Sequence, residues 1–244
     1  MMRILTAIFC GLLCAGGSPS VQADEKENAA ARIKVLLVTG GHGFEVEPFF
    51  KIFSDNQGIE FTAAKHGKDA DVYDRPDLLT YDVTVLYDMP KTITDEQKKK
   101  FLSLLEKGKG LVVLHHALVS YPGWETYEQI IGGSYSQQDE KSGKAGYQHD
   151  VDIPVEIIAR DHPITKGIAD FMVHDEIYWG FRVAADVQPL LRTTHPRSGN
   201  PIAWTRMHGD SRVVYLQLGH GRTAYEHPQY RELVARCIRW TAKR

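Results

Sequence analysis

Cysteine is scarce in this sequence, and its placement limits the redox chemistry that the chain can support. Three cysteines occur among 244 residues, and Cys10 and Cys14 lie in an apolar N-terminal run. Without that run Cys237 remains alone, so no internal disulfide can form. Cys237 follows Leu233 and Val234 on the apolar side of an expected helix, which indicates a small core residue rather than a nucleophile.

A strong charge of either sign is also missing. The 29 Lys and Arg residues nearly balance the 31 Asp and Glu residues, which gives a formal net charge of −2. No basic stripe alternates with aromatic residues, so nothing indicates a nucleic-acid partner. Beyond the N-terminal run, no apolar stretch is long enough to cross a bilayer. We therefore expect neither a nucleic-acid partner nor a membrane span in the mature chain.

The first 23 residues have the features of a secretory signal peptide. Met1–Arg3 is basic, and Ile4–Gly16 is apolar but short for a membrane span. The small residue Ala23 then offers a cleavage site. We expect a signal peptide at 1–23, a polar leader at 24–31, and a secreted protein, located in a periplasm.

Residues 32–244 are expected to form one domain, because no repeat, low-complexity tract or linker divides them. In the first part of this region, buried strands alternate with amphipathic helices. This βαβαβα order predicts an α/β fold with a doubly wound parallel sheet and helices on both faces. The expected strands are 35–38, 59–64, 83–87 and 110–114, and the expected helices are 45–56, one that opens with a capping box at Thr94, and 123–131.

The pattern changes from Gly132 onward. The polar segment 134–146 is long for a loop and suggests a rim or lid. Residues 149–158 alternate like an antiparallel strand, and Pro154 favours a position at the sheet edge. His162–Ile168 is expected to turn into a short helix. Further strands are expected at 187–194, 201–206 and 212–218, followed by a closing helix from Pro228 to Thr241.

The turn after the first expected strand combines glycines with an imidazole. Gly40, Gly41 and Gly43 surround His42, and glycine lets a ligand approach the backbone closely, here at Gly41. Ligands of α/β folds bind at the carboxyl ends of the strands. The pattern is neither G-x-G-x-x-G nor a P-loop, so it indicates no nucleotide. The alternative interpretation is a tight turn with a surface histidine.

Three expected strand ends carry histidine: His42, the pair His115–His116, and His220. Because parallel strands end at a common edge, we predict that His42, His116 and His220 meet in a cleft as acid/base groups or metal ligands. Neighbours in extended chain point to opposite faces, so either His115 or His116 should face the cleft. His116, nearer the loop, is slightly favoured, and His115 remains a candidate for substrate binding. Each could equally be a buried structural histidine with a hydrogen-bond partner.

The segment Asp175-Glu176-Ile-Tyr178-Trp179 supplies a carboxylate and aromatic groups. We predict Glu176 as the catalytic carboxylate and Tyr178 and Trp179 as substrate-binding residues, against the alternative of a solvated acidic patch. His149 is a further candidate for substrate binding. Other histidines, among them His66, His174, His195 and His208, have no special context and are expected at the surface. The cofactor stays open. A divalent metal such as zinc would need three His or Asp/Glu ligands and an open position, but no compact metal motif is present.

Six blocks of sequence resemble the ThuA-like (trehalose utilisation) family. They are Val-Thr-Gly-Gly-His-Gly-Phe-Glu, Leu-Val-Val-Leu-His-His-Ala, His-Pro-Ile-Thr-Lys-Gly-Ile, Asp-Glu-Ile-Tyr, Pro-Ile-Ala-Trp and Arg-Val-Val-Tyr-Leu-Gln-Leu-Gly-His-Gly. The resemblance implies a class I glutamine amidotransferase-like, flavodoxin-like sheet with added antiparallel strands. It also implies carbohydrate catabolism, including 3-keto derivatives of disaccharides. The amidotransferase nucleophile would follow Leu114, where His115 and His116 stand instead of cysteine, so thiol amidotransferase chemistry is not expected.

Residues and resemblance together suggest an exported enzyme of carbohydrate catabolism. It would act on a glycoside or a 3-keto-sugar derivative by hydrolysis, elimination or isomerisation, with His and Glu as acid/base groups and with metal assistance as an open option. The alternative is a carbohydrate-binding or accessory protein without turnover. The expected partner is a small carbohydrate, and the oligomeric state, including a homo-oligomer, stays open.

Overall fold

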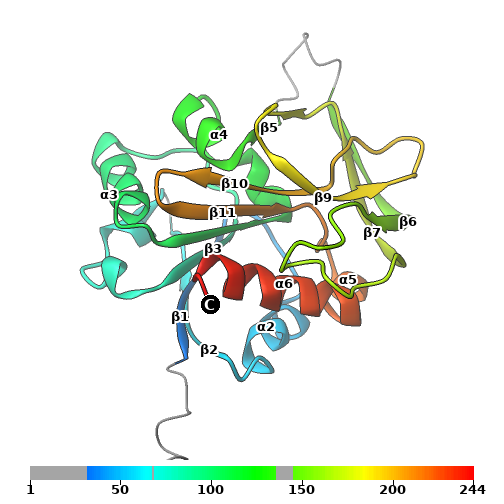
Figure 1. Cartoon of the computed structure of the whole chain (residues 1–244). Coiled ribbons are helices and arrows are strands. Elements are labelled where there is room, and N and C mark those ends of the chain that lie inside the picture. Colours follow the sequence, from blue (N-terminus) through cyan, green and yellow to red (C-terminus); the bar gives the residue numbers. More distant parts are fainter. Residues whose placement is uncertain (1–31, 68, 136–144) are drawn as a thin grey trace, which may run out of the picture. The chain divides into compact units, whose positions relative to one another are not determined.

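The computed structural model describes residues 32–67, 69–135 and 145–244, and one large mixed sheet organises them (Figure 1). The strands are β1 (Ile33–Gly40), β2 (Ile59–Lys65), β3 (Val83–Asp88), β4 (Gly110–Leu114), β5 (Gly133–Ser134), β6 (Gly146–Ile157), β7 (Phe171–Trp179), β8 (Arg182–Val183), β9 (Gln188–Thr193), β10 (Ala203–His208) and β11 (Ser211–Leu216). In the described chain, the large sheet has the order β2-β1-β3-β4-β11-β10-β9-β6-β7, and β5 pairs with β8 separately.

Helices of different lengths connect these strands. The α-helices are α2 (Val46–Ser54), α3 (Asp95–Glu106), α4 (Glu125–Ile131), α5 (Arg222–Tyr225) and α6 (Pro228–Thr241), and short 3-10 turns are η1 (Asp71–Asp74), η2 (Leu78–Thr80) and η3 (His115–Val119). The capping box predicted at Thr94 is present, because the Thr94 hydroxyl accepts the Gln97 N–H and the Gln97 side chain accepts the Thr94 N–H. The closing helix α6 begins and ends at the predicted residues.

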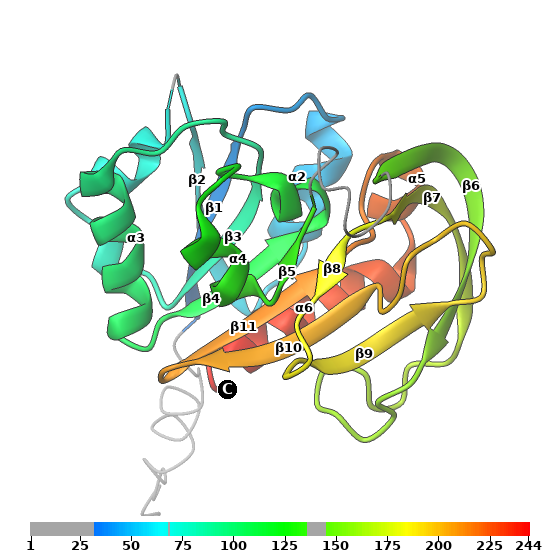
Figure 2. The same ribbon diagram turned by 90° about the horizontal axis from the view of Figure 1, so that it is seen from above.

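The sheet changes direction along its width. Strands β2, β1, β3, β4 and β11 are parallel to one another, so their carboxyl ends lie at one edge. Strands β10, β9, β6 and β7 continue the sheet with antiparallel pairing. Figure 2 shows β6, β7 and β9 on the side of the sheet away from β1, β2 and β3. The fold class is therefore confirmed: a parallel α/β sheet with added antiparallel strands.

Helices cover both faces of this sheet, as the alternation of elements predicted (Figure 1). On one face, α2 and α6 contribute Phe49 and Leu233 to a core that includes Val35 of β1. On the opposite face, α3 contributes Phe101 to a second core that includes Leu36. Both strand residues are fully buried, because successive side chains of a strand point to opposite faces and both faces are covered. This explains the uninterrupted apolar run at 35–38.

Two local predictions are wrong. Strand β6 was expected at the sheet edge, but it lies between β9 and β7. Pro154 is tolerated because the pairing of β6 with β9 begins only at Val155, so the ladder on that side ends beside the proline. His162–Ile168 forms successive hydrogen-bonded turns without a helix, and Gly167 interrupts them with a φ of +76°.

Parts of the sequence-based interpretation lie outside the described residues. These are the expected signal peptide at 1–23, the polar leader at 24–31, and the greater part of the expected rim at 134–146. Within the described residues, no helix is both long enough and apolar enough to cross a membrane.

Candidate functional site

The turn after β1 places His42 at the carboxyl edge of the sheet. Gly40 and Gly41 have φ values of +122° and +81°, which L-residues with a side chain rarely adopt. A Cβ on Gly41 would collide with the Met89 carbonyl, and the Met89 N–H donates to the Gly40 carbonyl over 2.8 Å. The glycines are therefore required by the close approach of the chain segments after β1 and β3, and this approach determines the position of the His42 backbone.

The turn after β4 carries His115 in an unusual backbone conformation. Its φ of +50° lies in the left-handed region, a strained state that persists at functional sites when the surroundings hold it. The ring is fully buried, and its Nδ1 lies 2.7 Å from the Gln217 carbonyl. A carbonyl oxygen only accepts hydrogen bonds, so Nδ1 must carry a proton. In the neutral ring, Nε2 then carries no proton, and its lone pair points into the site.

Several polar atoms converge on the carboxylate of Glu176. Its Oε2 lies 2.8 Å from His115 Nε2 and 3.1 Å from His220 Nδ1, and the two ring nitrogens are 3.2 Å apart. Its Oε1 lies 3.4 Å from His149 Nδ1, and the Tyr178 hydroxyl lies 2.9 Å from His115 Nε2. Because Glu176 is only 4% exposed, its charge requires positive charge nearby. That charge is either a proton on an imidazole or a bound cation.

Asp175, the neighbour of Glu176 on β7, fixes the loop that carries His220. Its carboxylate accepts the Gly219 N–H over 2.6 Å and the His220 N–H over 2.8 Å. The φ of Gly219 is +114°, and a Cβ there would collide with the Tyr230 hydroxyl. Burial raises the pKa of Asp175, although the positive charge of His115 and the backbone N–H groups oppose this effect. Asp175 therefore positions the loop and does not face the cluster.

His42 and His116 form a second layer beside this cluster. Their ring centroids are 4.4 Å apart, and the His116 ring also lies 4.3 Å from the Tyr87 ring and 5.4 Å from the His115 ring. Burial lowers the pKa of His116 to about 2, helped by the charges of His115 and His42, and it outweighs the opposing effect of a backbone contact with Tyr87. Burial also lowers the pKa of His42, which lies 6.1 Å from His220 between ring centroids.

The pKa values of Glu176 and His220 are shifted in the sense of an ion pair. Burial alone would raise the pKa of Glu176, but hydrogen bonds from His115 and His220 outweigh it and hold the pKa well below its usual range. The hydrogen bond to Glu176 raises the pKa of His220 against the effect of burial. The pair is therefore carboxylate and imidazolium when a proton supplies the positive charge.

The structure brings together most of the residues that the sequence singled out. Glu176 of β7 contacts imidazoles from the ends of β4 and β11 and from β6. His42, from the end of β1, lies beside the rings of His116 and His220. Between the adjacent histidines, His115 contacts Glu176, whereas the slightly favoured His116 packs behind His42. Trp179 has the Arg197 guanidinium over its ring at 4.7 Å, and no described contact joins it to Glu176.

Sequence reasoning missed a buried histidine outside the Glu176 cluster. His66, expected at the surface, is 3% exposed, and its Nε2 lies 3.0 Å from Asp88 Oδ2. Its Nδ1 accepts the Val72 N–H, so Nε2 carries the proton and donates to Asp88. Tyr121 donates a further hydrogen bond to the same carboxylate oxygen. Only the position of Asp88 at a strand end could have indicated this network.

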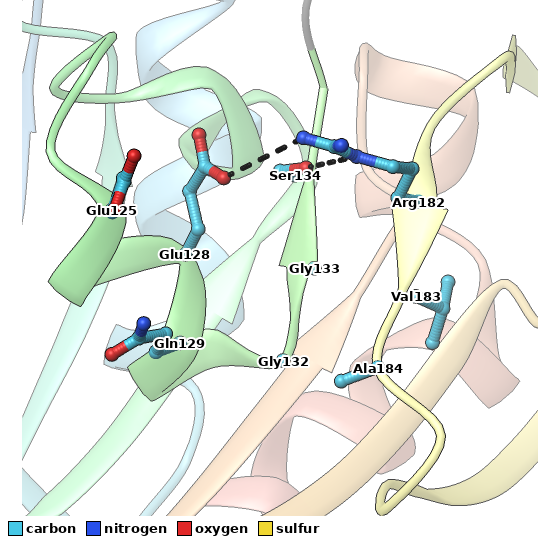
Figure 3. A pocket seen from close by; sticks show the side chains of 9 residues that line it. All are labelled: Glu125, Glu128, Gln129, Gly132, Gly133, Ser134, Arg182, Val183 and Ala184. Carbon is cyan, nitrogen blue, oxygen red and sulfur yellow. Dashed lines mark hydrogen bonds and ion pairs between the residues drawn. The ribbon is translucent and has the colours of Figure 1, made fainter. Parts of the chain in front are cut away.

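A separate polar groove of about 340 Å³ lies between α4 and the β5–β8 pair (Figure 3). Arg182 crosses it, with Nε 3.2 Å from Ser134 Oγ and a terminal nitrogen 4.0 Å from Glu128. None of its lining residues belongs to the Glu176 cluster. Tyr135, which follows the lining residue Ser134, has its ring 5.6 Å from that of Tyr178. The imidazole–carboxylate cluster, which has the reactive groups, is the candidate active site.

The sheet has parallel strands with helices on both faces, and antiparallel strands are added at one side. This arrangement is a class I glutamine amidotransferase-like fold. The turn after β4 carries histidine and no cysteine. The chain belongs to the ThuA family, described as trehalose utilisation, whose sequence profile matches residues 22–241. Family membership links the chain to carbohydrate catabolism.

Solved structures agree with this fold. A ThuA-like protein from Parabacteroides merdae is 19% identical with a TM-score of 0.73, and the match covers 86% of this chain and 90% of that one. A ThuA-like protein from Bacteroides uniformis is 22% identical with a TM-score of 0.67, over 92% and 95% of the chains. PurLQS from Thermotoga maritima is 13% identical with a TM-score of 0.55, over 86% and 99%. Comparison with curated proteins found no match.

Proposed function

We propose that this protein is an enzyme of carbohydrate catabolism that acts on a glycoside or a 3-keto-sugar derivative by hydrolysis, elimination or isomerisation. The observation that carries the proposal is the convergence of His115, His149 and His220 on the buried carboxylate of Glu176. This cluster lies at the carboxyl ends of parallel strands, where α/β folds bind their ligands.

Elimination from a 3-keto glycoside shows how these groups would work. A base removes the proton from C2, next to the ketone, and the electron pair forms a C1=C2 double bond while the bond from C1 to the leaving oxygen breaks. A general acid then protonates that oxygen. We assign the base to His42, with His116 packed against its ring, and the acid to the His220–Glu176 pair. Imidazole suits both tasks because it exchanges protons near neutral pH.

Substrate binding would use the groups around this centre. The Tyr178 hydroxyl, held by His115, would orient a sugar hydroxyl or the ketone oxygen. His149 has a side chain that is 43% exposed, so it can reach a ligand from the solvent side. The missing side chain of Gly41 leaves room for Met89, so Gly41 remains a candidate for substrate binding only through its backbone groups. Trp179 remains a weaker candidate, because Arg197 covers one face of its ring.

Incubation with a panel of glucosides and their 3-keto forms tests this proposal. We expect released sugar from at least one 3-keto glycoside, and loss of release in Glu176→Gln. His174→Ala is the matched control, because His174 lies on the same strand but is exposed and bonds to Asp152 instead. Sugar binding without turnover across the panel would favour the rival function, a carbohydrate-binding accessory protein.

We also propose that the protein is exported, with residues 1–23 removed as a signal peptide. The support is the order of basic, apolar and small residues at the N-terminus. N-terminal sequencing of protein from cell fractions tests this, with a mature chain starting at Asp24 as the expected result. An intact Met1 on cytoplasmic protein would contradict the proposal.

A further inference from the structure

We propose that His115, Glu176 and His220 bind one divalent transition-metal ion, such as zinc, through His115 Nε2, a Glu176 carboxylate oxygen and His220 Nδ1. Binding itself stands on the geometry of these residues, whereas its catalytic consequence rests on the proposed function. The sequence suggested His42, His116 and His220 as candidate ligands. The proposed site keeps His220 and has His115 and Glu176 in place of the other two.

The spacing of the three atoms fits a single ion. They form a triangle with sides of 2.8, 3.1 and 3.2 Å, and one point above it can lie about 2.1 Å from each corner, the usual distance for zinc with His and carboxylate ligands. All three ligand atoms lie within 4.8 Å of one another. Two imidazoles with one glutamate form a known type of catalytic zinc set, so these residue types suit borderline divalent metals.

In its neutral state, the His115 ring has the tautomer that a metal requires, and a bound ion would replace the proton that Nε2 shares with Glu176 in the absence of metal. Its Nδ1–H donates to the Gln217 carbonyl over 2.7 Å, so the free lone pair is on Nε2. Metal-bound histidines usually donate their other ring N–H to a carbonyl or carboxylate, which sets the tautomer and the ring orientation. Here that donor bond is present, and Nε2 faces a Glu176 carboxylate oxygen at 2.8 Å and the Tyr178 hydroxyl at 2.9 Å. A bound ion would take the place of the Tyr178 hydroxyl at the Nε2 lone pair.

The loop of His220 is held in the same way. Asp175 accepts the Gly219 and His220 N–H groups, so the backbone that carries this ligand is anchored by the residue next to Glu176. Two of the three ligands are therefore fixed by hydrogen bonds around them, which lowers the conformational cost of binding. Such outer contacts are expected where a site is built for a ligand.

One side of the cluster remains accessible for a fourth group. The His220 side chain is 30% exposed, and the His149 ring lies 4.3 Å from it between centroids. Water, His149 or a substrate oxygen could complete the coordination there. If the proposed sugar chemistry holds, the ion would polarise a ketone oxygen of the substrate, and His42 would remain the group that takes the proton.

Isothermal titration of the chelator-treated, untagged mature chain with zinc chloride tests the site. We expect one ion per chain, and binding at least about 100-fold weaker in His115→Ala and in Glu176→Gln. Cobalt(II) should give visible absorption bands that zinc removes. His174→Ala is the control, because exposed His174 with Asp150 and Asp152 could bind an ion weakly at the surface. The absence of binding would overturn the proposal, and binding lost only in His174→Ala would overturn it too and indicate an adventitious ion only.

Loss of folding is excluded by a second variant and by circular dichroism. His220→Ala removes a partly exposed ligand, so it should fold normally and still bind zinc at least about 100-fold more weakly. Unchanged affinity in folded His220→Ala would contradict the proposed ligand set. Zinc binding without turnover of any sugar would refute the proposed function alone, and turnover unaffected by chelator with no zinc binding would refute the metal site alone.

Discussion

Asp175 and Glu176 are neighbours on β7 whose carboxylates serve different purposes. The Asp175 oxygens accept the N–H groups of Gly219 and His220, whereas the Glu176 oxygens face the rings of His115, His149 and His220. Because the two side chains point to opposite sides of a strand, one acidic pair both anchors the loop after β11 and supplies the charge at the centre of the candidate site.

Asp175→Asn should destabilise the protein and displace His220. The amide can accept through only one oxygen, so at least one buried N–H of the loop loses its partner, at a cost of about 1–3 kcal/mol. Urea denaturation measures the free energy of unfolding. Asp152→Asn, an exposed carboxylate on the adjacent strand β6, should change it by less than about 0.5 kcal/mol. Equal stability of both variants would show that Asp175 does not anchor the loop.

Gly41→Ala should be far more harmful than Gly43→Ala in the same turn. Alanine at residue 41 must adopt a φ of +81° and would collide with the Met89 carbonyl, so we expect a loss of at least about 2 kcal/mol. A Cβ on Gly43 meets nothing within 4 Å, and its replacement should be nearly neutral. Thermal and urea unfolding of the two variants provide the comparison. Similar losses would show that the turn can rearrange.

Cys237 should not react in the folded protein. The residue is 2% exposed, and burial raises the pKa of its thiol to about 12, so on the order of one thiol in 10⁴ is ionised at pH 8. Iodoacetamide should label the mature chain, residues 24–244, only after unfolding in guanidinium chloride, as mass spectrometry of intact protein would show. Rapid labelling of native protein would reopen the thiol amidotransferase alternative.

Two His–Asp pairs differ mainly in burial and should differ in energy. His66→Ala leaves Asp88 as a buried carboxylate without its imidazole partner, so we expect a loss of about 3 kcal/mol. His174→Ala breaks an exposed pair with Asp152 and should cost less than about 1 kcal/mol. Denaturant unfolding measures both losses. Losses of the same size would mean that His66 is not held by its buried partner.

The meeting of histidines at one edge could be predicted, because it follows from the direction of parallel strands alone. The choice between His115 and His116 could not be made from the sequence. That argument assumed extended backbone, whereas the φ of +50° at His115 turns its ring toward Glu176. The folded positions therefore depend on one dihedral angle that no sequence pattern specified.

Other features depended on contacts that are distant in sequence. Glu176 reaches the site because β7 pairs with β6, and β6 in turn pairs with β9, an arrangement that local alternation does not determine. The edge position expected from Pro154 was wrong for the same reason. His66 is buried because Asp88 lies next to it in space, 22 residues later in the chain. By contrast, the capping box at Thr94 and the helix from Pro228 are local signals, and the structure confirms both.

The left-handed turn at residue 115 carries a different reactive side chain from the one expected in an amidotransferase. In the fold that this chain shares with amidotransferases, the corresponding turn carries a sulfur nucleophile that forms a bond with its substrate. Here the turn after β4 presents an aromatic nitrogen base beside the Glu176 carboxylate. Under the proposed function, replacement of one side chain would exchange covalent catalysis for proton transfer or ion binding. New chemistry could then arise in this fold by substitution of a reactive side chain, without a change in the backbone.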